Sequence, residues 1–293
     1  MQKNKRFDQN WKFWFVIVAL LIVSINAVLS EPAPHPHATH LKPKKKKPTP
    51  INQEALKEAK IYSGVLYLSE TQIYEKLTYE YGDNFSPETA QAVIKHLKID
   101  FNTNALARAK DYSNKEHLSK NKIYDYLITD KFTAAQANYA VEHLKVDYNE
   151  NALLIGKSYS ETDHLSKNKI YKQLIDKLDG SFSVKNAKYA VKHLEVNYNE
   201  NALFRAKSFL EEEPLSKKGI YDKLAGNFGE EFTAENAQYA VAHLEVDYNS
   251  NALAKAKTYR EDSDISDGDL REQLDARGFT PEEIRYAINH LAQ

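Results

Sequence analysis

Histidine is the residue type with the widest chemical repertoire that recurs at regular intervals in this sequence. The five copies stand in similar contexts, such as AVEHL and AVKHL, at His96, His143, His193, His243 and His290. A metal site on a helix needs a second ligand at helical spacing, and the HExxH arrangement is absent. A partial positive charge is favoured near the C-terminal end of a helix, so we interpret the five histidines as structural residues.

Acidic and amide side chains form a second regular cluster, in the segments DYNEN at 147–151 and DYNSN at 247–251. These segments resemble the first half of a calcium-binding loop, but they lack the glycine at the sixth position and the bidentate glutamate at the twelfth. In another copy Asn197 replaces the aspartate. Asp and Asn side chains also cap helices and form Asx turns, which is the role that we predict here. We therefore expect no metal ion and no other cofactor.

Lysine and tyrosine form two further series. The lysines recur at one position of the first helix, at Lys60, Lys110, Lys157, Lys207 and Lys257. The tyrosines are Tyr74, Tyr124, Tyr171 and Tyr221, and Arg271 takes the fifth place. Solvated lysines and half-buried tyrosines are the simplest interpretation. If a partner surface exists, periodic tyrosines are its best anchors, because protein interfaces favour Tyr. The candidate partner-binding residues are therefore Tyr74, Tyr124, Tyr171, Tyr221, Lys110, Lys157, Lys207 and Lys257.

No catalytic arrangement is recognisable in the sequence. It contains no cysteine, which excludes disulfides, thiolate metal sites, cysteine nucleophiles and lipid attachment through a cysteine. It also contains no plausible Ser-His-Asp set, and no Walker or dinucleotide fingerprint. We expect a protein that is not an enzyme.

The recurring residues belong to one repeated unit. An Ala-Leu pair begins at positions 55, 105, 152, 202 and 252, at spacings of 50, 47, 50 and 50 residues. A constant period in this range is typical of repeat architectures. The sequence predicts five repeats, at residues 51–101, 102–148, 149–198, 199–248 and 249–293.

Each repeat is predicted to hold three helices, because N-cap residues and apolar staples recur before helical apolar patterns. The predicted caps of the first helices are Asn52, Asn102, Asn149, Asn199 and Asn249, with staples such as Tyr148 to Leu153. Those of the second helices are Ser69, Ser119, Ser166, Ser216 and Ser266. Those of the third helices are Ser86, Thr133, Ser183, Thr233 and Thr280, each preceded by Phe. One unit of this size buries a marginal core, so neighbouring units are expected to touch. The predicted fold class is all-α, a tandem array of helix-turn-helix-like repeats.

The first 50 residues differ from the repeats. Lys3, Lys5, Arg6 and Lys12 precede an apolar run, 13–29, which fits either a cleaved secretory signal or an uncleaved membrane anchor within 1–30. We favour the anchor, because the run is long for a signal core and flanking Trp residues suit the membrane interface. Residues 31–50 contain six prolines and are predicted to be an extended spacer. Its histidines, His35, His37 and His40, are interpreted as part of that spacer rather than as a metal site.

Charge argues against a nucleic-acid partner. Residues 1–50 carry 9 Lys/Arg and 2 Asp/Glu, whereas residues 51–293 carry 31 Lys/Arg and 39 Asp/Glu. The second and third helices of a repeat could imitate a DNA-reading helix-turn-helix, but phosphate binding needs an excess of basic residues. A DNA-binding repeat protein is therefore the least favoured alternative.

The repeated pattern NALxxAKxY…LSKxxIYxxL…FTxxxAxYAVxHLxVDYNxNAL resembles the repeat of the Ltp-type host cell surface-exposed lipoproteins, a family of phage superinfection exclusion. The resemblance covers residues 51–293. It implies a protein of Gram-positive bacteria or their prophages, on the cytoplasmic membrane with its repeats on the extracellular face. It also implies that the protein blocks phage DNA injection by binding an injection component such as the tape-measure protein. No functional residues carry over, because the pattern is a structural signature.

Two features depart from that family. Its lipoproteins are attached through a lipidated cysteine, so this chain is expected to use the helix predicted at 13–29. Five repeats also exceed the small number expected of the phage-encoded members, which leaves open a cellular homologue with another role. The alternative function is surface adhesion or binding of cell-wall polymer through the same repeats.

Overall fold

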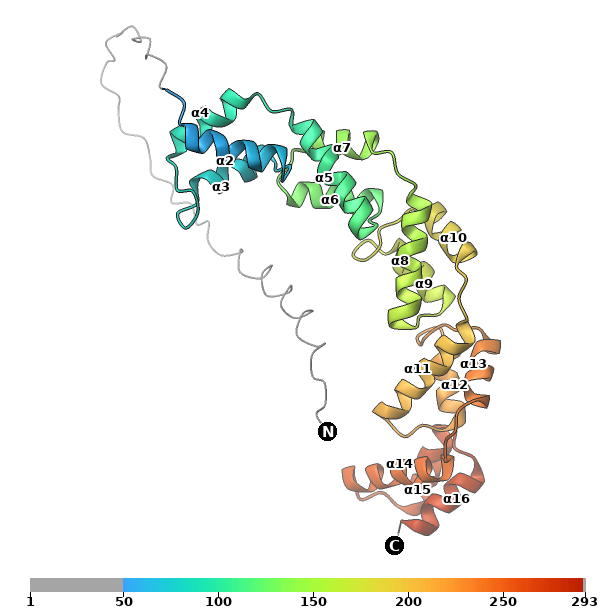
Figure 1. Ribbon diagram of the computed structural model, residues 1–293. Helices are drawn as coiled ribbons and strands as arrows, with labels where there is room; N and C mark the ends of the chain where they lie inside the picture. Colours follow the sequence, from blue (N-terminus) through green and yellow to red (C-terminus); the bar gives the residue numbers. More distant parts are fainter. Residues whose placement is uncertain (1–49, 292–293) are drawn as a thin grey trace, which may run out of the picture. The chain divides into compact units, whose positions relative to one another are not determined.

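The computed structural model describes residues 50–291, and all regular structure in that range is α-helical (Figure 1). Fifteen helices, three to each repeat, confirm the predicted all-α class of five tandem repeats. The predictions for the signal or anchor at 1–30, for nearly all of the 31–50 spacer and for its histidines lie outside the described residues. Within residues 50–291, every helix is too short or too polar to cross a bilayer.

The helices follow one order in each repeat. The first repeat holds α2 (Gln53–Gly64), α3 (Glu70–Thr78) and α4 (Pro87–Leu97). The second holds α5 (Phe101–Glu116), α6 (Lys120–Thr129) and α7 (Ala134–His143). The third holds α8 (Tyr148–Asp163), α9 (Lys167–Ile175) and α10 (Val184–His193). The fourth holds α11 (Tyr198–Glu212), α12 (Lys217–Ala225) and α13 (Ala234–Ala242). The fifth holds α14 (Tyr248–Asp262), α15 (Asp267–Ala276) and α16 (Pro281–His290).

The second and third helices begin at the predicted caps. The hydroxyl of Ser119, for example, accepts a hydrogen bond of 3.2 Å from the backbone N–H of Lys122. Thr133 and Gln136 form a complete capping box, in which each side chain satisfies a backbone N–H that helix geometry leaves free. At all ten predicted positions the Ser or Thr side chain accepts a hydrogen bond from the backbone N–H three residues farther along the chain.

The predicted start of the first helix is correct in one repeat and wrong in four. Asn52 caps α2, whereas the caps of the later first helices lie two residues before the predicted caps Asn102, Asn149, Asn199 and Asn249. Their caps are Asp100, Asp147, Asn197 and Asp247. The side chain of Asp147 accepts from the backbone N–H of Asn149 at 2.8 Å, an acceptor that the helix start favours. Tyr148 is therefore the first helical residue, and the staple from Tyr148 to Leu153 is also wrong. The first repeat has Pro50 at the place of the aspartate, which offers no acceptor, so its helix starts at the next cap.

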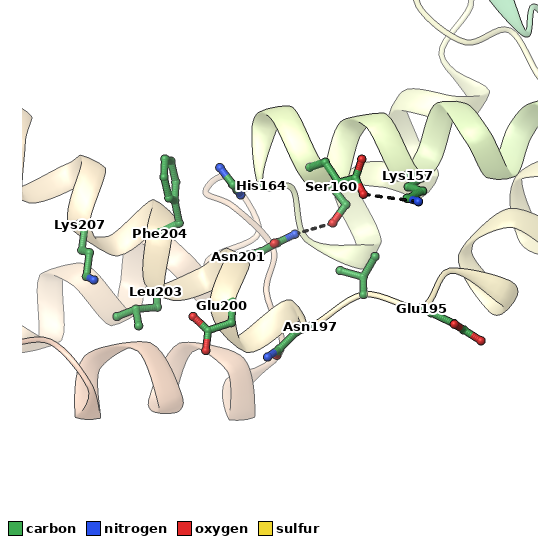
Figure 2. Close-up of a pocket in the computed structure, with 12 residues that line it drawn as sticks. Lys157, Ser160, His164, Glu195, Asn197, Glu200, Asn201, Leu203, Phe204 and Lys207 are labelled. Carbon is green, nitrogen blue, oxygen red and sulfur yellow. Dashed lines mark hydrogen bonds and ion pairs between the residues drawn. The ribbon is translucent and has the colours of Figure 1, made fainter.

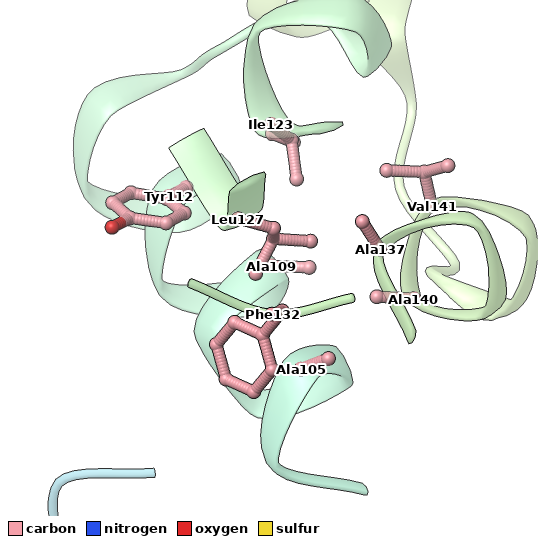
Figure 3. Close-up of a cluster of buried hydrophobic side chains, with 9 residues drawn as sticks. All are labelled: Ala105, Ala109, Tyr112, Ile123, Leu127, Phe132, Ala137, Ala140 and Val141. Atoms are coloured by element: carbon pink, nitrogen blue, oxygen red, sulfur yellow. The ribbon is translucent and has the colours of Figure 1, made fainter. Parts of the chain in front are cut away.

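Each repeat has its own hydrophobic core. In the second repeat (Figure 3) the side chains of Ile123 and Leu127 of the second helix are fully buried between the first and third helices. Alanines such as Ala105 and Ala140 let those two helices approach closely. The corresponding buried pairs are Ile73 and Leu77, Ile170 and Leu174, Ile220 and Leu224, and Leu270 and Leu274.

A phenylalanine closes each core just before the third helix. The N–H of Phe132 donates to the carbonyl of Leu127 at 3.0 Å, and Lys131 before it has a positive φ of 64°. This turn brings the Phe132 side chain, 3% exposed, back over the second helix. In the other repeats, too, the residue before the equivalent phenylalanine has a positive φ: Asn84, Ser181, Glu231 and Gly278.

Candidate functional site

The junctions between repeats are held by an asparagine, which is buried at the first three junctions and half-buried at the fourth. It stands immediately before the repeated Ala-Leu pair and opens each later repeat at Asn104, Asn151, Asn201 and Asn251. Its side-chain amide donates to the backbone carbonyl of a leucine in the preceding repeat. The acceptors are Leu68 at 2.9 Å, Leu118 at 2.9 Å, Leu165 at 3.1 Å and Leu215 at 2.8 Å. We call these four residues the junction asparagines.

A junction asparagine also reaches a serine of the preceding repeat. Asn151 donates to the hydroxyl of Ser113 at 3.1 Å, and Asn201 donates to that of Ser160 at 2.9 Å. The first repeat has Glu54 at the equivalent position, and it is exposed, because no repeat precedes it. Sequence analysis missed this role. The available signal was that Asn precedes Ala-Leu in the last four copies, whereas Glu54 precedes it in the first.

In the first and fourth repeats the capping serine of the second helix makes the reverse contact, toward the following repeat. Ser69 donates to the carbonyl of Asp130 at 2.7 Å, and Ser216 donates to the carbonyl of Arg277 at 2.6 Å. Ser69 and Ser216 are 0% and 1% exposed, whereas Ser266 of the last repeat is exposed. The same hydroxyl thus caps its own helix and binds the next repeat.

Ion pairs differ from junction to junction. Where the first two repeats meet, Asp130 accepts from Arg108 at 2.9 Å and from the phenol of Tyr112 at 2.5 Å. Burial and the bond to Asp130 raise the pKa of the Tyr112 phenol, so it remains a donor. The third repeat has Ile155 at the place of Arg108. At its junction with the second repeat, side chains donate to backbone carbonyls, as Asn121 does to the Ser181 carbonyl at 3.0 Å.

The junction of the third and fourth repeats contains a buried carboxylate. Glu230, 6% exposed, accepts from Lys169 of the third repeat at 2.8 Å and from Arg205 of its own repeat at 2.7 Å. Burial alone would raise the pKa of Glu230, but the hydrogen bonds and charges of its two partners outweigh burial and lower it. At the next junction Glu213 bridges Lys223 and Lys255, at 2.7 and 3.0 Å.

An open groove of about 490 Å³ lies at the junction of the third and fourth repeats (Figure 2). The Phe204 side chain is 52% exposed, and its ring centroid lies 3.7 Å from the centroid of the His164 ring. Lys157 pairs with Glu161 at 3.6 Å, and Lys207 lies farther along the same groove. The groove therefore offers an aromatic pair with charges of both signs, which suits a protein surface better than a small anion.

The structure brings some candidate residues together and separates others. Lys157 and Lys207 line the same groove, and Lys207 also lines the groove at the next junction, beside His243. Lys110 and Lys257 are exposed at equivalent helix positions. The four tyrosines are half-buried against the cores of their own repeats: Tyr74, Tyr124, Tyr171 and Tyr221. Tyr74 lines a groove of the first repeat, so the tyrosine and lysine series occupy different places.

Four of the five periodic histidines have a local structural role. The ring of His143 stacks on Tyr139 at 4.0 Å, and its Nδ1 lies 2.8 Å from the Tyr139 carbonyl, to which it donates. The same pairing recurs at His193, His243 and His290. Among residues 50–291, no three His, Asp or Glu side chains gather as a metal site would require.

Comparison with known proteins places these repeats among relatives. The model of the host cell surface-exposed lipoprotein family matches residues 51–97, 100–144, 147–194, 197–244 and 247–291. A solved structure, that of Ltp, a superinfection exclusion protein from the Streptococcus thermophilus temperate phage TP-J34, is 33% identical over the matched region. The match covers 34% of this chain and 100% of that one, with a TM-score of 0.31. Comparison with curated proteins gives no match.

Proposed function

From the premise that the chain belongs to the host cell surface-exposed lipoprotein family, we propose that it is a surface protein that binds other proteins and excludes superinfecting phage. The observation that carries the proposal is that the family repeat fills residues 51–291 five times in succession. Ltp of phage TP-J34, which is similar to part of this chain, is itself a superinfection exclusion protein.

The mode of action in this proposal is binding rather than chemistry. Within residues 50–291, many charged and polar side chains join neighbouring repeats, cap helices or are exposed to solvent. Arrays of this kind use an extended surface to bind partners. The partner that we propose is a phage component needed for DNA injection, such as the tape-measure protein, and its capture at the cell surface would stop DNA entry.

Attachment to the membrane is a separate part of the proposal. The chain has no cysteine for lipidation, so the apolar segment at 13–29 would serve as the anchor and residues 31–50 as the spacer. The repeats would then stand on the extracellular face of the cytoplasmic membrane.

Phage challenge of cells that express the full-length protein tests the proposal. DNA entry, measured as potassium efflux or as uptake of labelled phage DNA, is expected to fall for some phages while adsorption is unchanged. A chain that lacks residues 1–30 is the matched control, and it should protect poorly because its repeats stay inside the cell. Unchanged DNA entry for every phage in a broad panel contradicts the proposal. Retention of the full-length protein by purified cell wall would favour the alternative role in wall binding.

A further inference from the structure

The loop between the second and third helices exists in a long and a short form. From the cap of the second helix to the cap of the third, the second and fifth repeats are three residues shorter than the others. The long loops are 79–85, 176–182 and 226–232, in the first, third and fourth repeats. Each runs to the phenylalanine that closes the core.

Every long loop presents a large apolar side chain to solvent at one shared position, and the first long loop also exposes Tyr79, whose ring centroid lies 5.8 Å from that of Tyr81. Tyr81, Leu178 and Phe228 are 83%, 86% and 107% exposed. All three stand four residues before the core-closing phenylalanine, so they occupy one structural position. We call them the tip residues. The short loops are too short to contain this position.

The backbone of each long loop is held in place. In the third repeat, Phe182 N–H donates to the Leu174 carbonyl at 2.8 Å, and Ser181 N–H donates to the Asp176 carbonyl at 2.7 Å. The side chain of Asp176 accepts from the Leu178 N–H at 2.8 Å. Asn121 and Lys122 of the preceding repeat donate to the carbonyls of Ser181 and Leu178.

The other two long loops are held in a similar way. In the fourth repeat, Gly229 N–H donates to the Gly226 carbonyl at 2.9 Å, and Glu231 pairs with Lys172 of the preceding repeat at 2.5 Å. In the first repeat, Gly82 N–H donates to the Tyr79 carbonyl at 3.0 Å. The tip residues are therefore presented by ordered backbone.

Single exposed apolar residues are common on proteins, but these three are not scattered. They share one position, they accompany one insertion, and their loops are hydrogen-bonded. Burial of such a side chain against a partner would stabilise the complex, a gain that solvent exposure forgoes. Ordered presentation lowers the entropy cost of binding, as expected of an interface anchor.

We propose that Tyr81, Leu178 and Phe228 are the anchors that insert into apolar pockets on the protein partner of this array. This inference rests on the proposed function, since it assigns the binding surface to these loops rather than to the lysine-lined grooves. The exposed carboxylate of Glu80 adjoins Tyr81, whereas Leu178 stands between Lys177 and Asp179. Basic groups around the pocket for Tyr81 would complement Glu80, whereas an anionic lipid surface would repel it.

The test uses full-length protein and the triple variant Tyr81→Ser, Leu178→Ser, Phe228→Ser. The control variant, Val65→Ser with Val184→Ser, removes apolar side chains that are 66% and 51% exposed elsewhere. The probes are the purified tape-measure protein of a phage that fails to inject DNA into expressing cells, and phosphatidylglycerol vesicles. Helical circular dichroism and thermal unfolding should be unchanged in both variants, because every substituted side chain is exposed.

The triple variant is expected to bind the tape-measure protein at least ~10-fold more weakly than wild type, with the control within twofold. Equal binding by the triple variant and wild type overturns this inference and leaves the proposed function standing. Loss of wild-type vesicle binding in the triple variant also overturns it, because lipid is then the occupant. A wild-type protein that binds no tape-measure protein removes the proposed partner and this inference together.

Discussion

Asn201 and Leu165 belong to different repeats, yet the side-chain amide of Asn201 donates to the Leu165 carbonyl across 3.1 Å. The carbonyl lies just before the cap of α9, where helix geometry supplies no backbone partner. One side chain thus satisfies a backbone acceptor that its own repeat leaves free. Because three short helices bury a marginal core, such contacts make each repeat depend on its neighbour.

Asn201→Ala is expected to destabilise the array by about 1–3 kcal/mol, because the Leu165 carbonyl and the Ser160 hydroxyl each lose a buried partner. Urea unfolding followed by circular dichroism measures the change. The control is Glu54→Ala, the same position in the first repeat, which is exposed and should change stability by less than about 0.5 kcal/mol. Equal effects of the two substitutions would show that the junction bond contributes nothing.

Glu230→Gln is expected to destabilise the protein at pH 7 by about 1–3 kcal/mol, because Lys169 and Arg205 lose their shared carboxylate. The pKa of Glu230 is lower in the folded protein, so its stabilisation is present above the ordinary value of 4.5 and is lost as the pH falls through the folded pKa. The difference between wild type and variant should therefore shrink in acid below about pH 4.5. Urea unfolding at several pH values measures it. Glu161→Gln, in an exposed pair, should show little effect at any pH.

The fold of one repeat could be predicted because its signals are local. Ser119 and Thr133 cap helices through backbone N–H groups three residues away, and Ile123 is buried by the helical pattern around it. The predicted start of α8 was wrong because two nearby residues, Asp147 and Asn149, can each cap the same helix end. The aspartate prevails, since its side chain bonds the Asn149 N–H.

The contacts between repeats could not be predicted in the same way. The partner of Asn151 lies in another copy, and a backbone carbonyl such as that of Leu118 leaves no mark on residue type. Ion pairs were harder still to predict, because Arg108 and Arg205 pair with carboxylates 22 and 25 residues farther along the chain. In the third repeat Ile155 takes the place of these arginines. The tip residues depend on exposure, which the sequence pattern of a loop does not reveal.

Tyr148→Phe is expected to leave stability at pH 7 unchanged or to raise it by up to about 1 kcal/mol. The Tyr148 hydroxyl is buried without a hydrogen-bond partner among the described residues, and the second repeat has Phe101 at this position. Burial raises the pKa of Tyr148 from 10.0 to about 12, so the unfolded phenol ionises before the folded one and wild type loses stability as the pH rises from 10 toward 12. The variant should therefore lose less stability than wild type over that range, as urea unfolding would measure. Tyr81→Phe, at an exposed ring, should follow wild type.

Gly229→Ala is expected to destabilise the fourth repeat by about 1–3 kcal/mol, because a Cβ there would overlap the carbonyl oxygen of Lys223. The loop must shift to admit it, and Glu230 beside it would lose its bonds. Hydrogen exchange at the N–H of Phe232, which bonds the Leu224 carbonyl at 2.9 Å, should become faster. A Cβ at Gly64 meets nothing within 4 Å, so Gly64→Ala should be neutral or stabilising. Similar destabilisation by both substitutions would contradict the expectation.

The first and last repeats have acidic residues at positions that hold neutral or basic residues at the junction of the third and fourth repeats. The first repeat has Glu54 at the junction-asparagine position and Glu58 at the position of Arg205. The last repeat has Asp269 at the position of Lys169. Head-to-tail contact between two molecules would bring these carboxylates close together, and their mutual repulsion would oppose that contact.

The variant Glu54→Asn, Glu58→Arg, Asp269→Lys is therefore expected to associate head to tail, because it recreates the junction of the third and fourth repeats between molecules. Asp83 of the first repeat stands two residues before Phe85, as Glu230 stands before Phe232, and would supply the shared carboxylate. A head-to-tail interface that does not close into a ring forms open chains, so mass measured by light scattering should rise with concentration. Wild type should show no such rise, and high salt should weaken association of the variant through screening. A variant that stays at constant mass at every concentration would show that the acidic ends do not limit assembly.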